Sequence, residues 1–148
     1  LVWRWVGGGH YYPVLSSIAK VWPLPTPAPI PVADFAKSLH PDYIVDGHDA
    51  VKAIPVDFGL MTGYVAIYQS ASMCGQIGCP FVVITGNPGH FQANGEGIID
   101  TIGGTIPDKG WNAFAVQRGG EAFDFYRYEG GRYTLYASTS PMPHLPAP

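Results

Sequence analysis

Two short stretches of this chain gather side chains that could do chemistry. The first holds Asp42, Asp46, His48 and Asp49 within eight residues, and these oxygen and nitrogen groups could ligate a cation. The residues between them do not supply the further oxygens of a calcium loop of the Asp-x-Asp-x-Asp-Gly kind. We therefore expect a turn in which the aspartates bond their own backbone.

An enzyme site in the same stretch is a second interpretation. His48 and Asp49 could act as base and orienting group for a nucleophilic serine such as Ser70 or Ser72. The chain has no Gly-x-Ser-x-Gly elbow to hold such a serine. The glycine-rich residues 86–97 lack the lysine and the hydroxyl residue of a phosphate-binding loop. An enzyme with an unrecognised site near Asp46, His48 and Asp49 is kept only as an alternative.

The second stretch is the cysteine loop, residues 74–79, which begins and ends at the two cysteines of the chain, Cys74 and Cys79. Gly75 and Gly78 stand beside them and let the loop fold back tightly enough for a disulfide. Free thiols, a redox pair and a metal site are the alternatives. The histidines are too dispersed for a metal site, and a redox pair prefers Cys-x-x-Cys at a helix start. A disulfide would place the chain in the periplasm or outside the cell.

The first third of the chain is its most unusual part. Residues 1–22 are rich in aromatic side chains and have no core of their own, so they would expose more apolar surface than a monomer usually tolerates. We expect them to form a docking arm outside the core of the main domain. The arm is expected to bind a larger protein subunit through Trp3, Trp5, Tyr11, Tyr12 and Trp22.

A proline-rich linker follows at residues 23–32, with proline at every second position from Pro23 to Pro31. Because proline lacks the amide donor and fixes φ, residues 23–31 are predicted to be extended and to join neither a helix nor a central strand. Residues 33–140 have the length of one globular domain. Residues 141–148 form a second extended, proline-rich tail.

The composition narrows the class of partner. Charged residues make up 13% of the chain and hydrophobic residues 47%, so the charged share is about half the usual one and favours burial of the surface by a partner. The net charge is −3 and the eight Lys and Arg are scattered singly, which argues against nucleic acid. No apolar run is long enough for an ordinary membrane span. We expect no cofactor, and we expect any export signal to have been removed before Leu1.

Strand-length apolar runs separated by glycine turns predict a mainly β fold, an antiparallel sheet or meander with one short helix. The helix is expected over residues 33–40, ended by Pro41. Residues 42–57 are expected to form two short strands around a turn. Residues 64–69 and 81–85 should pair as central strands that are buried on both faces and clipped by the cysteine loop.

The last third of the domain should contain a loop and a meander. Residues 86–110 hold seven glycines and predict a long mobile or docking loop. Three apolar runs between 111 and 136 are joined by Gly-Gly turns, which indicates an antiparallel meander. In the middle run, Phe123 and Phe125 alternate with Tyr126 and Tyr128, so one face should be core and the other should carry outward tyrosines.

The cysteine loop, followed by the aromatic hairpin with a Gly-Gly turn at 126–133, resembles small extracytoplasmic β domains of bacteria with a Cys-Gly-x-x-Gly-Cys loop. This resemblance covers residues 43–138 and implies a sheet and an oxidising compartment, but no activity. The plan of a small cofactor-free subunit with a wrapping arm is also similar to the third subunit of membrane-bound quinoprotein alcohol and aldehyde dehydrogenases.

These observations predict a non-catalytic accessory subunit of a periplasmic or membrane-associated complex, docked through its arm. If the partner is membrane-bound, the tryptophans of the arm are expected near the membrane interface. The alternative is a secreted binding or inhibitor module that uses the 86–110 loop and the tyrosine face. In that case substitution of His90 and Phe91 should abolish binding.

Overall fold

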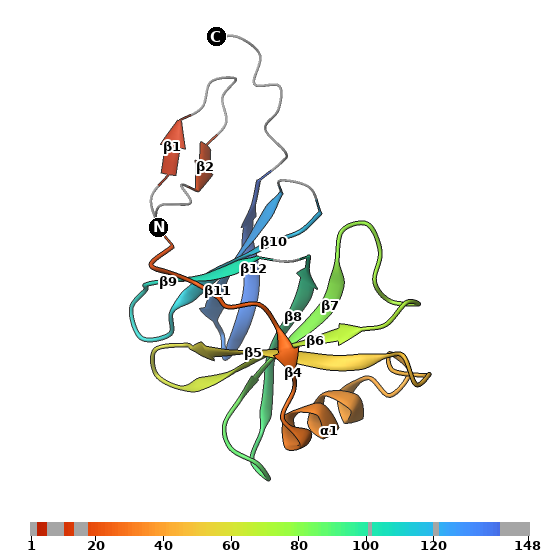
Figure 1. The fold of residues 1–148 in the computed structure, drawn as a ribbon. Coiled ribbons are helices and arrows are strands. Elements are labelled where there is room, and N and C mark those ends of the chain that lie inside the picture. The colour runs from red at the N-terminus through yellow and green to blue at the C-terminus, as the bar shows by residue number, and fades with distance from the viewer. Residues whose placement is uncertain (1–2, 6–10, 14–17, 101, 120–121, 140–148) are drawn as a thin grey trace.

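Two antiparallel sheets of five strands make up the body of the protein in this computed structural model (Figure 1). The structure describes residues 18–100, 102–119 and 122–139, together with the backbone of residues 3–5 and 11–13. Over these residues the chain is mainly β with one short helix, which confirms the predicted fold class.

The first sheet runs β4-β5-β6-β7-β8, so neighbours in the sequence are neighbours in the sheet. Its central strands β6 and β7 pair and are buried on both faces, as predicted. Val65 and Val83 pack into the core between the sheets, whereas Ala66 and Val82 pack on the helix side. The strands are β4 (Thr26–Pro27), β5 (Ala50–Asp57), β6 (Thr62–Gln69), β7 (Cys79–Thr85) and β8 (Gln92–Ile99).

The second sheet runs β12-β11-β10-β9-β3. It contains the predicted meander, in which β11 and β12 are joined by a turn at Gly130 and Gly131, both with positive φ. Its strands are β3 (Lys20–Val21), β9 (Gly103–Ile106), β10 (Ala113–Gln117), β11 (Phe123–Glu129) and β12 (Arg132–Ser138).

The main core lies between the two sheets and is built from alternating aliphatic and aromatic side chains of both. A second cluster lies between the first sheet and helix α1 (Ile30–Leu39), where Val32 and Ala36 pack on Val51, Tyr68 and Ile84. Figure 1 shows α1 alongside the first sheet, away from the meander. The first sheet is therefore covered on both faces, which explains its continuous apolar runs.

Helix α1 begins earlier than the proline pattern predicts. Pro29 is its N-cap and Pro31 lies in its first turn, where a missing amide donor costs nothing and the fixed φ suits the helix. The prediction that residues 23–31 join no helix is therefore wrong from Ile30 onward. The predicted end is confirmed, since the helix stops at Leu39, before Pro41.

Two local predictions are wrong. Residues 42–46 form no strand, so only the second half of the expected strand pair exists, as β5. Residues 86–110 are not one long loop, because β8 and β9 lie within them and pair with β7 and β10. Among the described residues, the loop surface that the binding-module alternative requires is reduced to the short connections at 86–91 and 107–110 and to residues 100 and 102.

The tyrosine face of the meander is also not a surface. Tyr126 is only 5% exposed and stacks on Phe114 in the main core, with ring centroids 5.0 Å apart. Tyr133 is buried beside them and donates a hydrogen bond from Oη to the backbone oxygen of Asn112 at 2.6 Å. Burial raises the pKa of Tyr126 to about 12 and raises that of Tyr133 as well. The prediction of outward tyrosines is wrong for Tyr126 and Tyr133, because this face of the meander packs into the main core between the sheets.

Candidate functional site: the N-terminal strap and what it carries

The proline-rich stretch is a strap, residues 18–29, that bridges the edges of both sheets. β3 pairs with β9, and the Trp22 amide donates to the backbone oxygen of Gly103 at 2.8 Å. At its other end β4 pairs with β5, and the Ala28 amide donates to the backbone oxygen of Val51 at 3.1 Å. Prolines are tolerated here because both pairings are at sheet edges.

Trp22 anchors the strap in the main core. It is 7% exposed, its ring lies 5.4 Å from that of Phe114, and its Nε1 donates to Thr105 Oγ1 at 2.9 Å. The absence of a side chain at Gly103 leaves room for the indole, because a Cβ there would overlap it. The prediction that all of residues 1–22 lie outside the core is therefore wrong for Trp22, and its buried ring is not available to a partner.

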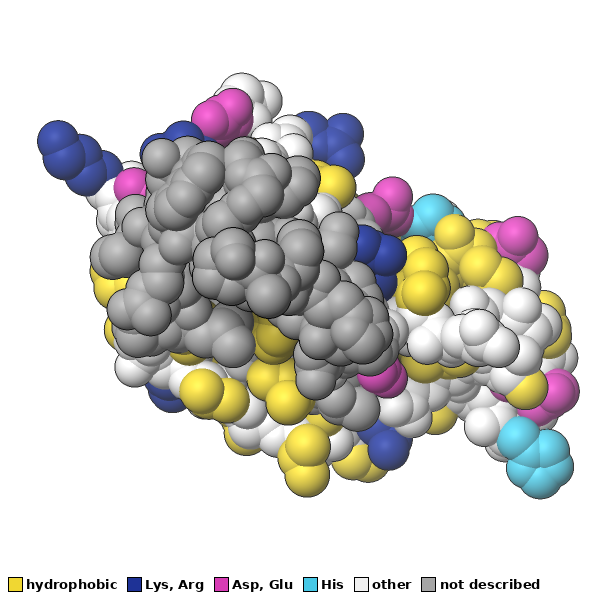
Figure 2. Space-filling view, turned by 90° about the horizontal axis from the view of Figure 1, so that it is seen from above, with side chains coloured by type: hydrophobic (Ala, Val, Ile, Leu, Met, Phe, Trp, Pro, Cys, Tyr) yellow, Lys and Arg dark blue, Asp and Glu magenta, His cyan; other side chains and the backbone are white. Residues whose placement is uncertain are grey.

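The strap presents large apolar side chains to the outside. Val21 and Leu24 are 66% and 76% exposed, and Ile30, at the start of α1, is 77% exposed. Figure 2 shows hydrophobic side chains lying among singly placed charged ones on the face that borders the residues not described. An apolar strap with few charges beside it is typical of a surface that is covered in a complex.

A groove of about 480 Å³ runs beside the strap. Its walls come from the strap, the start of α1, strands β5 and β6, and the 86–91 connection. Prolines and aromatic rings form about half of its lining, including Pro23, Pro29, Pro55, Tyr64 and Phe91, and the rest is aliphatic, glycine and polar. The binding-module alternative names His90 together with Phe91. His90 is exposed at the tip of that connection.

Residues ahead of the strap include a two-stranded hairpin. β1 (Trp3–Trp5) pairs antiparallel with β2 (Tyr11–Pro13), with Trp3 opposite Pro13, Arg4 opposite Tyr12, and Trp5 opposite Tyr11. Positions 3, 5, 11 and 13 therefore belong to one face of the ribbon, and positions 4 and 12 to the other. The side chains of the four remaining predicted contact residues lie outside the described residues: Trp3, Trp5, Tyr11 and Tyr12.

The cysteine loop is closed as predicted. Cys74 and Cys79 form a disulfide with a Cα–Cα distance of 4.2 Å. Inside the loop, Gly75 and Gly78 exchange two backbone hydrogen bonds of 3.0 and 3.2 Å. Gly78 has a φ of +126° and packs against the backbone of Ile99, so the tight turn needs a glycine there.

In the acidic turn near His48, the aspartate side chains accept hydrogen bonds from backbone amides of the same turn, as predicted. Asp46 Oδ1 accepts the His48 amide at 2.7 Å, and Asp49 Oδ2 accepts the Val45 and Asp46 amides at 2.9 and 3.2 Å. The Val45 amide is the main cause of the lowered pKa of the Asp49 carboxyl, and Ser70 contributes. Within the described residues, no group of three or more His, Cys, Asp and Glu side chains could hold a metal ion.

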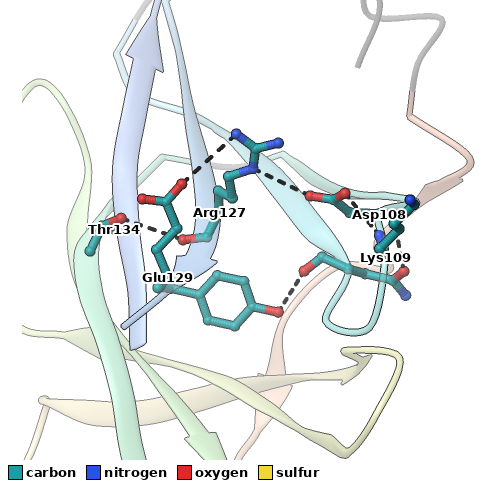
Figure 3. Close-up of polar contacts among 7 residues, drawn as sticks. Asp108, Lys109, Arg127, Glu129 and Thr134 are labelled. Carbon is teal, nitrogen blue, oxygen red and sulfur yellow. Dashed lines mark hydrogen bonds and ion pairs between the residues drawn. The ribbon is translucent and has the colours of Figure 1, made fainter. Parts of the chain in front are cut away.

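The connection between β9 and β10 is tied to the meander by polar contacts (Figure 3). The Arg127 Nε on β11 donates to Asp108 Oδ2 at 3.4 Å, and its Nη1 lies 3.8 Å from Glu129 Oε1. Trp111 stacks on Tyr128 with ring centroids 4.1 Å apart. This part of the predicted mobile loop is therefore held by side-chain contacts.

The site residues that the sequence interpretation missed are those of the strap itself. Leu24 lies between Pro23 and Pro25, and an apolar residue between prolines on an extended edge segment is the signal that could have identified it. Val21, in the edge strand β3, has no such signal in the sequence. No helix among the described residues is long and apolar enough to cross a membrane. No family model matches the chain, and neither a curated protein nor a solved structure matches it.

Proposed function

We propose that this protein is a non-catalytic accessory subunit of a periplasmic or extracellular complex, and that it docks on a larger protein through its N-terminal segment. The observation that carries the proposal is the strap. It is hydrogen-bonded to both sheets and anchored by Trp22, so the root of the docking segment has a fixed position on the domain.

A fixed root favours docking for an energetic reason. The strap is already bound to its own domain, so it loses less conformational entropy when a partner covers it than a free tail does. Aromatic residues in a small central cluster commonly supply most of the binding free energy of an interface. Trp3, Trp5 and Tyr11 occupy positions of one face of the hairpin, and we propose that this face enters an apolar groove of the partner.

The exposed apolar residues of the strap extend the same surface. Val21 and Leu24 follow the hairpin in the sequence and are exposed on the strap, so we propose that a partner that holds the hairpin also covers them. The low charge of the chain suits such burial. If the partner is membrane-bound, the tryptophans of the hairpin would lie near the membrane interface, where indole rings are favoured.

The proposed compartment rests on the disulfide. A Cys74–Cys79 bond persists in the periplasm or outside the cell, whereas cytosolic thiols are usually kept reduced. The partner is therefore sought among extracytoplasmic proteins.

Natively extracted protein should elute with a larger protein on a sizing column with mass detection. The variant Trp3→Ala with Trp5→Ala should elute alone, while its thermal unfolding stays that of the parent chain. The matched control is Arg4→Ala, at a position on the other face of the ribbon, which should keep the partner. Elution of the parent chain alone, or an equal loss of the partner in the control, would overturn the proposal.

A further inference from the structure

A second cavity, of about 470 Å³, lies on the side of the domain where the end of α1, strand β8 and the turn between β11 and β12 meet. It has no part in the docking proposal above. Three side chains with hydrogen-bonding or charged groups line it from three different elements: His40, Glu96 and Arg132. Glycine backbone at Gly95, Gly130 and Gly131 forms the rest of the polar wall.

A β-bulge places Glu96 in this cavity. Val82 pairs with Glu96 and Ile84 with Ala93, so Asn94 and Gly95 of β8 stand opposite one residue of β7. Buried Asn94 holds the bulge by donating from Nδ2 to Thr85 Oγ1 at 2.7 Å. Bulges of this kind redirect a side chain and are common beside binding sites.

Gly95 of the bulge also lets β12 approach. Its φ is +154°, and an added Cβ would lie 2.9 Å from Cβ of Tyr133. The backbone of β8 and the start of β12 therefore meet closely, which brings Arg132 to the same cavity as Glu96.

His40 is held in one orientation. Its ring stacks on Tyr43 with centroids 4.3 Å apart and meets the edge of Tyr68 at 5.6 Å. Tyr68 is fixed in turn by a 2.7 Å hydrogen bond from Oη to the backbone oxygen of Ala36 in α1. The Nε2 of His40 is hydrogen-bonded to Oε1 of Glu96. The imidazole therefore holds the Glu96 carboxylate through Oε1 and leaves its second oxygen, Oε2, for a ligand.

Two charges at this cavity have unused binding capacity. Within the described part of the chain, neither the Arg132 guanidinium nor Glu96 Oε2 makes a hydrogen bond or an ion pair. A guanidinium matches the two oxygens of a carboxylate, and a carboxylate oxygen accepts from an ammonium group. The cavity volume lies within the range of small-molecule sites.

We propose that this cavity binds a free α-amino acid, with the ligand carboxylate on Arg132 and the ligand ammonium on Glu96. His40 acts as a positioning residue for Glu96. The glycine walls leave space for the ligand's own side chain and offer backbone groups to it.

The test is a two-dimensional NMR titration of the 148-residue chain with glycine, L-glutamate and L-phenylalanine. Acetate and methylamine are the probes that carry only one of the two charges. We expect a zwitterionic probe to shift the amide signals of Gly95, Gly130 and Gly131. Each single-charge probe should bind at least about tenfold more weakly than the zwitterionic probe.

Arg132→Gln should weaken the zwitterionic probe by about tenfold or more, and Glu96→Gln should do the same while acetate binding is kept. The matched control is Arg127→Gln, an arginine of the same hairpin outside the cavity. The proposal is overturned if no probe shifts these signals, if acetate binds as tightly as glycine, or if the control weakens binding as much as Arg132→Gln does.

Discussion

At the scale of single residues, the packing of the Trp22 ring against Gly103 anchors the strap to the second sheet. The sequence predicts Trp22 to be a docking residue because it belongs to an aromatic-rich arm without a core of its own. What the sequence does not reveal is a glycine about eighty positions later that opens a space for the indole. The space that Trp22 fills exists because Gly103 has no side chain, and no local sequence pattern near Trp22 indicates this.

Gly103→Ala should displace the Trp22 ring and lower the free energy of unfolding by about 1–3 kcal/mol, because the new Cβ would overlap the indole. Urea unfolding followed by tryptophan fluorescence measures this. Gly47→Ala is the control, since a Cβ there meets no atom within 4 Å. Equal stability of the two variants would show that Trp22 does not anchor the strap.

The buried tyrosines make the protein sensitive to alkali. The pKa of Tyr126 is raised to about 12, above the value of about 10 for an unfolded chain. A raised pKa in the folded state contributes stability that is fully present below about pH 10 and is lost as the pH rises through the folded pKa. The urea concentration at half-unfolding should therefore decrease as the pH is raised from 10 to about 12. The phenolate absorbance of the buried tyrosines should rise over the same range, above the pH at which exposed tyrosines ionise.

Tyr126→Phe keeps the ring in the core and removes the titrating hydroxyl, so its urea midpoint should fall less over the same pH range. If every tyrosine of the folded parent chain titrated near pH 10 with the sheets intact, the assignment of these rings to the core would be wrong.

At the scale of elements, the sequence predicts a strand, a helix end or a turn correctly where residues close together in the chain determine it. The runs that became β6, β7 and the meander are apolar, are bounded by turn residues and lie next to their pairing partners. The end of α1 follows from Pro41, and the closed cysteine loop follows from its two glycines. Each of these depends on residues close together in the chain.

The failed element is β8, whose glycines predict a loop. Gly97 and Gly95 serve close packing instead, since a Cβ at Gly97 would lie 2.7 Å from the Phe81 ring and one at Gly95 would meet Tyr133. The cavity beside β8 could not be predicted either. His40, Glu96 and Arg132 are distant in the sequence and come together only through the bulge and the sheet-to-sheet packing.

The disulfide should act as a local clip between β6 and β7. Replacing both Cys74 and Cys79 by serine should lower the free energy of unfolding by about 2 kcal/mol, because the bond closes only a short loop. Urea unfolding with and without dithiothreitol checks this, since reductant should bring the parent chain to the stability of the variant and leave the variant unchanged. A variant as stable as the oxidised parent would contradict this role.

At the scale of the whole molecule, the protein is a packed double-sheet body, and we propose that the residues ahead of the strap dock on a partner. The boundary matters for any truncation, because residues 18–22 belong to the body through β3 and Trp22. The proposed docking segment is therefore shortened to residues 1–17. The body supplies the fixed root, and the hairpin supplies the aromatic positions.

The most direct measurement is the native mass of the extracted protein for the parent chain, a form lacking residues 1–17 and a form lacking residues 1–22. We predict a complex with a larger protein for the parent chain and a folded, lone domain of parental thermal stability for the first truncation. The second truncation should be less stable, because it removes Trp22 from the core. A first truncation that still holds the partner, or a parent chain that never forms a complex, would contradict the account.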